Sequence, residues 1–138
     1  MNRRDFQELS KLRRREAQAL LAGSFFHGAY YLAGYSLECA IKACIAKQTK
    51  RHQFPDKKLA QEAHVHDLSK LLQLSGLQPD FDKELKTNQA FQLNWAIAKD
   101  WSEVSRYNGS LTQAEARDLY SACTARNNGL LSWISRRW

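Results

Sequence analysis

The architecture of this chain depends most on Ala29–Lys47, which reads AYYLAGYSLECAIKACIAK. At about 100° per residue, this stretch predicts a helix that is apolar over most of its circumference. Its broadest apolar face is formed by six residues, namely Phe26, Tyr30, Ala33, Leu37, Ile41 and Cys44. A helix of this kind contacts neighbours on several sides, so we expect it to lie at the centre of a helical domain.

A membrane-spanning role for this helix is not expected. Its uncharged part, from Phe25 to Leu37, is much shorter than the roughly 20 residues that a bilayer crossing requires. Glu38 and Lys42 would also lie deep in hydrocarbon. We therefore expect a cytoplasmic protein without membrane contact, in which the three cysteines Cys39, Cys44 and Cys123 are small buried residues rather than disulfides or metal ligands.

The rest of the chain shows helical periodicity, and β-branched runs typical of strands are missing. Residues 1–138 are predicted to form a single all-α domain, an up-and-down bundle of four to five main helices. Ser24 is the predicted N-cap of the central helix, Asp67 caps a later one, Gly76 ends it, and Pro79 begins the next. The expected helices are Arg4–Ala22, Phe25–Gln48, a short one near Leu59–Ala63, one from Asp67 to Gly76, a short one after Pro79, a long one at Thr87–Arg106, and a last one from the Thr112/Glu115 capping box towards Trp138.

In the long helix, Leu93, Ile97, Trp101 and Val104 are predicted to share one face, and at least one of Trp95 and Trp101 should belong to the core. In the last helix, the inward residues are expected to be Leu119, Tyr120, Cys123, Leu130 and Ile134. The two tryptophans near the end of the chain, Trp133 and Trp138, either close the bundle or leave an apolar patch for a partner protein.

The chain is strongly basic, with a formal net charge of +7 and a pI near 9.5. Such a charge suits a polyanionic partner such as RNA, because lysine and arginine displace counterions from phosphates. A basic protein without such a partner is the competing interpretation. The predicted loop Gln48–Lys58 forms a local basic patch with four cations, namely Lys50, Arg51, Lys57 and Lys58.

A polar stripe runs along the central helix, and its members lie within about 80° of one another on the helical wheel. It consists of His27, Tyr31, Tyr35, Glu38 and Lys42. One interpretation is structural: Glu38 and Lys42 form an i, i+4 ion pair, and the tyrosines bury their rings. The other is a groove in which aromatic rings stack with a base while the charged pair contacts a phosphate.

Catalytic and metal-binding motifs are scarce. The sequence has no glycine-rich phosphate loop, nucleophile elbow or zinc-finger spacing. His64 and His66 beside Asp67 are the only metal-like cluster, and capping or packing explains them better, so no metal or cofactor is expected. Arg106, next to Tyr107, ends a predicted helix, where a guanidinium complements the helix dipole or holds a phosphate.

Three motifs in order, AYYLAGYSLECAIKACIAK, HDLSKLL and WSEVSRY, resemble the HEPN domain superfamily (higher eukaryotes and prokaryotes nucleotide-binding) from Phe25 onwards, and its small stand-alone prokaryotic members in particular. The resemblance implies a bundle of about four helices and a homodimer or other protein partner. It also implies a role in toxin–antitoxin or defence systems, either as a metal-independent endoribonuclease or as the partner of a minimal nucleotidyltransferase or antitoxin. Such ribonucleases use an arginine followed, after four to six residues, by a histidine, and Arg106 matches the arginine.

The histidine of that motif is missing, because positions 111 to 113 are Leu111, Thr112 and Gln113, and no histidine follows His66. Without an imidazole there, the usual catalytic mechanism is not expected, although His27 or His66 could reach the site from another helix. The sequence therefore favours binding of RNA or nucleotide over catalysis, with Arg106 the best candidate for any catalytic role. The predicted binding residues are Tyr31, Tyr35, Glu38, Lys42, Arg106 and Tyr107.

Overall fold

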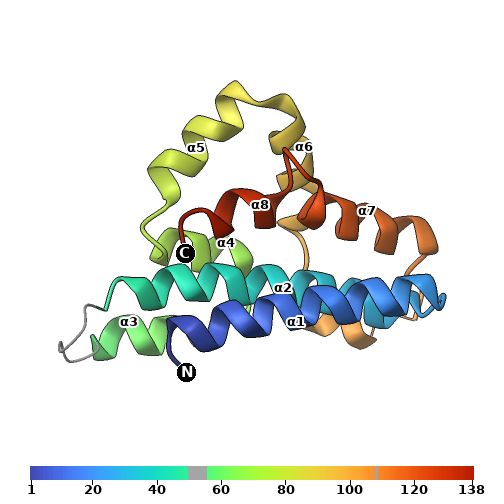
Figure 1. Ribbon diagram of the computed structural model, residues 1–138, viewed down its shortest axis with the longest axis horizontal. Helices are drawn as coiled ribbons and strands as arrows, with labels where there is room; N and C mark the ends of the chain where they lie inside the picture. The colour runs from blue at the N-terminus through green and yellow to red at the C-terminus, as the bar shows by residue number, and fades with distance from the viewer. Residues whose placement is uncertain (50–55, 108) are drawn as a thin grey trace.

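The computed structural model describes residues 1–49, 56–107 and 109–138, and all regular elements in these ranges are helices. The predicted all-α bundle is therefore confirmed (Figure 1). In chain order the elements are α1 (Arg3–Ala22), α2 (Phe26–Lys47), α3 (Lys57–Glu62), α4 (Leu68–Leu74), α5 (Gln78–Thr87), α6 (Gln89–Ala98), the 3-10 helix η1 (Glu103–Tyr107), α7 (Gln113–Thr124) and α8 (Leu130–Ser135). Most of the predicted basic loop, including Lys50 and Arg51, lies outside the described residues, and Lys57 and Lys58 begin α3.

The helix α2 is central, as its apolar circumference predicted. It runs alongside α1 and also packs against α4, α7, α8 and η1 (Figure 1). More than half of its residues are buried, among them Leu37, Ile41 and Cys44 from the predicted apolar face. At the α1 contact, the buried Ser10 hydroxyl donates a hydrogen bond to the Ser36 carbonyl at 2.7 Å. Small residues at this contact let the two helix backbones approach closely.

The connection between α1 and α2 corrects one prediction. Ser24 is not the N-cap of α2, because it has a left-handed backbone with φ 65° and completes the end of α1. The amide of Phe25 donates to the Leu20 carbonyl at 2.8 Å, and the amide of Ser24 donates to the Leu21 carbonyl at 3.2 Å. These two bonds form a Schellman motif, which satisfies the last carbonyls of α1.

The caps around α4 and α5 match the sequence predictions. The Asp67 side chain accepts a hydrogen bond from the Lys70 amide at 3.0 Å, so it caps α4. Gly76, with φ 79°, ends that helix in the left-handed conformation that favours glycine. Pro79 lies in the first turn of α5, and Phe81 is buried below it.

The predicted long helix Thr87–Arg106 is wrong, because α5, α6 and η1 divide that stretch. Asn88 accepts a hydrogen bond from the Phe91 amide and starts α6, which ends at Ala98. The shared face is wrong too: Trp101 is buried, whereas Leu93, Ile97 and Val104 are exposed. The chain must leave the helical path after Ala98 to bring the Trp101 indole against α2.

The predicted last helix is also two helices, α7 and α8. The Thr112/Glu115 capping box is present at the start of α7, as predicted. After Thr124 the backbone becomes extended at Ala125, and the Gly129 amide donates to the Ala125 carbonyl at 3.0 Å. A Cβ at Gly129 would overlap that carbonyl, so the turn requires glycine.

Aromatic rings from three helices, α5, α6 and α8, close the core. Phe81 makes edge-on contacts with Phe91, Trp95 and Trp133, with ring centroids 5.0–5.3 Å apart. Trp133 is buried and Trp138 half-buried, so the predicted apolar patch at these tryptophans is wrong and they close the bundle instead. Within the described residues, no helix combines the length and apolar character that a bilayer crossing demands.

Candidate functional site

The two stripe tyrosines lie in a row of flat groups across α1, α2 and the segment before η1. The rings of Tyr31 and Tyr35 stack with centroids 6.0 Å apart and planes 28° apart. On one side, the Trp101 ring lies 6.1 Å from Tyr31. On the other, the Arg13 guanidinium lies over Tyr35, 5.8 Å from the ring centroid. We call these four residues the aromatic row.

The position of Trp101 in this row depends on Gly34 of α2. A Cβ at Gly34 would overlap the indole, so only glycine leaves room for the ring. Trp101 is buried, yet its Nε1–H has no hydrogen-bond partner among the described residues. The hydroxyl of Ser105, in η1, is likewise buried without a described partner. The contact between α2 and η1 is therefore close but leaves two polar groups unsatisfied.

Beside the aromatic row, a histidine joins two carboxyl groups. Glu38 is only 1% exposed, and its Oε1 lies 2.6 Å from Nδ1 of His66. The other ring nitrogen of His66, Nε2, lies 3.1 Å from Oε2 of Glu103, at the start of η1. We call Glu38, His66 and Glu103 the carboxyl–histidine cluster. It connects the centre of α2, the segment before α4 and the first residue of η1.

The burial of Glu38 affects the protonation of the carboxyl–histidine cluster. Loss of solvent raises the pKa of Glu38 above its usual value, while the charge of Lys42 and the bond to His66 oppose that rise. A neutral imidazole can donate from only one nitrogen, whereas an imidazolium donates from both and satisfies both carboxylates. The cluster can therefore hold a proton between Glu38 and His66 and bring an imidazole to the molecular surface, where His66 is 38% exposed.

The remaining predicted residues are only partly brought together. Lys42 does not form the predicted ion pair with Glu38, although its charge acts on that carboxyl group, whose hydrogen-bond partner is His66. Lys42 lines a cavity of about 900 Å³ between α1, α2 and α3. His64 lines the same cavity. Tyr107 lies on η1 with 75% of its surface exposed. Arg106 also belongs to η1, and its side chain lies outside the described part of the structure.

Sequence reasoning missed three members of this region, namely Arg13, Trp101 and Glu103. A run of three arginines such as Arg13–Arg14–Arg15 is typical of a solvated face, and the contacts of Arg13 with Tyr35 and Glu16 depend on the fold and the helix geometry. Among the described residues, no group of three or more histidine, cysteine, aspartate or glutamate side chains could hold a metal ion. Comparison of the chain with protein-family models, curated proteins and solved structures gives no match.

Proposed function

We propose that this protein binds RNA or a nucleotide on the surface formed by α2 and η1, as the resemblance to HEPN proteins implies. The observation that carries the proposal is the aromatic row, in which Tyr31 and Tyr35 are partly exposed and stacked in line. Aromatic rings stack with any base, and each such contact is worth about 1–3 kcal/mol. The row lies beside η1, which contributes Arg106 and the exposed ring of Tyr107.

The charge of the chain supports the same proposal. A net charge of +7 attracts the phosphate backbone. Arg13 is paired with Glu16 at 2.6 Å, and we expect its remaining N–H groups, next to Tyr35, to contact a phosphate beside a stacked base. Glu38 has a different role from the predicted one. It is buried and orients His66, so it is expected to act on the ligand only through that imidazole.

The experiment is fluorescence anisotropy with a labelled single-stranded RNA over a range of salt concentrations. We expect the affinity to fall as the salt concentration rises, because binding of the protein releases counterions from the phosphates and added salt opposes that release. Arg106→Ala and Tyr31→Ala should each weaken binding by about tenfold, which corresponds to about 1.4 kcal/mol. Arg4→Ala removes the same charge from an exposed position at the start of α1 and should change the affinity little. If no RNA or nucleotide binds at low salt, the proposal is wrong.

The carboxyl–histidine cluster favours a second candidate function, metal-independent RNA cleavage. His66 contacts Glu103, the first residue of η1, and η1 also carries Arg106, so a histidine from another segment contacts this helix although none follows the arginine in sequence. In that reaction, the substrate would displace Glu103 from Nε2 of His66, and this nitrogen would then take the proton from a 2′-hydroxyl, whose oxygen attacks the adjacent phosphorus. The 5′-oxygen of the next nucleotide would leave with a proton, and a 2′,3′-cyclic phosphate would remain.

The test for cleavage compares two histidines that lie two residues apart. His66→Asn should abolish formation of the cyclic phosphate, whereas His64→Asn should leave it unchanged, because His64 faces the cavity around Lys42. Intact RNA after incubation with the native protein would remove this candidate and leave the binding proposal standing.

A role as one half of a two-protein system, with an antitoxin or a minimal nucleotidyltransferase, is the third possibility that the resemblance implies. Leu93 and Ile97 are exposed one turn apart on α6, and such a pair suits a contact with a partner or a second copy. We expect a dimer in light scattering and its dissociation in Leu93→Lys. A monomer at high concentration would contradict the homodimer.

A further inference from the structure

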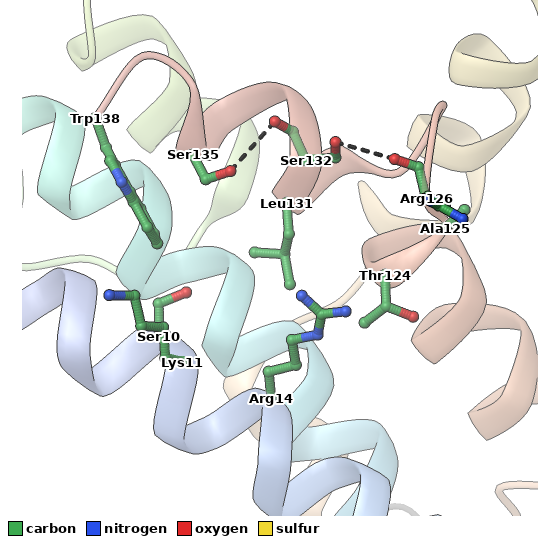
Figure 2. Close-up of a pocket in the computed structure, with 10 residues that line it drawn as sticks. All are labelled: Ser10, Lys11, Arg14, Thr124, Ala125, Arg126, Leu131, Ser132, Ser135 and Trp138. Carbon is green, nitrogen blue, oxygen red and sulfur yellow. Dashed lines mark hydrogen bonds between the residues drawn. The ribbon is translucent and has the colours of Figure 1, made fainter.

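A second cavity lies between α1, the turn that follows α7, and α8, and it has a volume of about 390 Å³ (Figure 2). That volume is within the range of pockets that enclose small molecules. Its lining is formed by Ser10, Lys11, Arg14, Thr124, Ala125, Arg126, Leu131, Ser132, Ser135 and Trp138. It shares no residue with the aromatic row or with the carboxyl–histidine cluster.

The lining of this cavity has only one sign of side-chain charge. Lys11, Arg14 and Arg126 are cationic, and no aspartate or glutamate is among the lining residues. Lys11 forms an exposed ion pair with Glu8 at 3.1 Å. Arg14 is exposed and makes no hydrogen bond or ion pair with the described residues, and Figure 2 shows its guanidinium pointing towards Leu131 and Thr124. A free guanidinium beside other cations favours an anion.

The hydroxyl groups around the cavity indicate which side chains would donate to that anion. The Ser132 hydroxyl donates to the Arg126 carbonyl at 3.2 Å, and Ser135 donates to the Ser132 carbonyl at 3.2 Å (Figure 2). Thr124 donates to the Tyr120 carbonyl at 2.7 Å. Because these hydrogens are already used, the side-chain donors that remain for a ligand are those of the arginines, Lys11 and the indole N–H of Trp138.

One side of the cavity is apolar. Leu131 is buried beneath it, and the Trp138 ring points into it towards Ser10 (Figure 2). We propose that this cavity binds an organic phosphate. Arg14 forms paired hydrogen bonds with the phosphate oxygens, and Arg126 and Lys11 contribute positive charge. The organic part of the ligand packs against Leu131 and Trp138. This proposal does not depend on the function proposed for the α2–η1 surface.

The experiment is an NMR titration of the ¹⁵N-labelled protein with phenyl phosphate at constant ionic strength. We expect saturable shifts of the amides of residues 124–126 and 131–135. Arg14→Gln should weaken binding at least about tenfold, since a charge-assisted pair is lost, whereas Arg15→Gln should change it less than about twofold. Arg15 is exposed and does not line the cavity, so it is a matched control.

Three outcomes would overturn the proposal. The shifts could be confined to α2 and η1, the two arginine variants could lose equal affinity, or phenol could produce the same shifts as phenyl phosphate. The spectra of the variants themselves report whether each is folded. Arg126→Gln is a second variant that should weaken binding without touching α1.

Discussion

At the scale of single residues, Glu38 has the strongest influence on the candidate site. Its carboxyl group is buried at the centre of α2, where an unpaired charge would cost several kcal/mol. The bond to His66, 28 positions later in the chain, offsets that cost and fixes the imidazole against η1. The same contact thus stabilises the fold and orients the one imidazole of the site.

The raised pKa of Glu38 has a predictable effect on stability. A carboxyl group whose pKa is higher in the folded chain favours folding at low pH and loses that contribution as pH rises through the folded pKa. We therefore expect the free energy of unfolding of the native chain, minus that of Glu38→Gln, to fall as the pH rises above the ordinary pKa of a glutamate, about 4. Urea unfolding at several pH values measures this difference. A difference that stays constant with pH would contradict the prediction.

Gly34→Ala should displace Trp101, because the new methyl group would overlap the indole. We expect a loss of about 1–3 kcal/mol, the usual cost of overpacking, and an altered near-ultraviolet circular dichroism spectrum. The control is Gly28→Ala in the same helix, where the methyl group meets only the flexible end of Leu20. That variant should be neutral or stabilised by up to about 1 kcal/mol. Equal effects of the two substitutions would show that the contact with Trp101 is unimportant.

The sequence predicted the tyrosines of the site but not their surroundings. Helical spacing alone places Tyr31 and Tyr35 one above the other, and the structure confirms that they stack. The same spacing suggested Lys42 as the partner of Glu38, since a helical wheel compares only residues of one helix. His66 comes from another segment, so its contact with Glu38 depends on tertiary packing that no local pattern contains.

At the scale of elements, three helix ends that a side chain or a glycine fixes were predicted well, whereas the side-chain caps Asn2 of α1 and Asn88 of α6 were missed. Asp67, Gly76 and Thr112 behave as expected, since capping is a local interaction between neighbouring residues. The division of Thr87–Arg106 was missed because its cause is distant: Trp101 must leave the helical path to reach Gly34. Ser24 was assigned to the wrong helix, because a serine next to a glycine can serve either the end of one helix or the start of the next.

The cap of α4 gives a prediction that connects an element with the site. Asp67→Ala removes the acceptor of the Lys70 amide and should cost about 1 kcal/mol in urea unfolding. Asp67→Asn keeps an acceptor of the same shape, so its stability should stay within a few tenths of a kcal/mol of the native value. Because His66 is the preceding residue, Asp67→Ala should also broaden the His66 ring signals in NMR. A stable alanine variant with sharp His66 signals would rule out this role for the cap.

At the scale of the whole molecule, the reactivity of the cysteine thiols measures how well the bundle excludes solvent from its core. Cys39, Cys44 and Cys123 are buried and free, as the sequence predicted. Burial raises the pKa of Cys39 and Cys123 to about 12 and that of Cys44 to about 11. Since the thiolate is the reactive form, native thiols should react with dithionitrobenzoate at least about a hundredfold more slowly than unfolded ones. Rapid reaction of one thiol in the native protein would show local opening.

The run Arg13–Arg14–Arg15 has a consequence for how α1 finds its position. Arg13 lies over Tyr35, Arg14 lines the cavity of about 390 Å³, and Arg15 does not line that cavity. If α1 shifted by one residue so that each position was taken by the next residue, Arg14 would lie over Tyr35 and Arg15 would line the cavity. Charge therefore cannot distinguish the correct packing of α1 from this shifted one. That discrimination falls to the buried Ser10 and Ala17, whose neighbours in sequence are too large for the same space. In α1, the small buried side chains of Ser10 and Ala17 therefore fix the register of packing against α2, whereas the long arginine side chains fit more than one register.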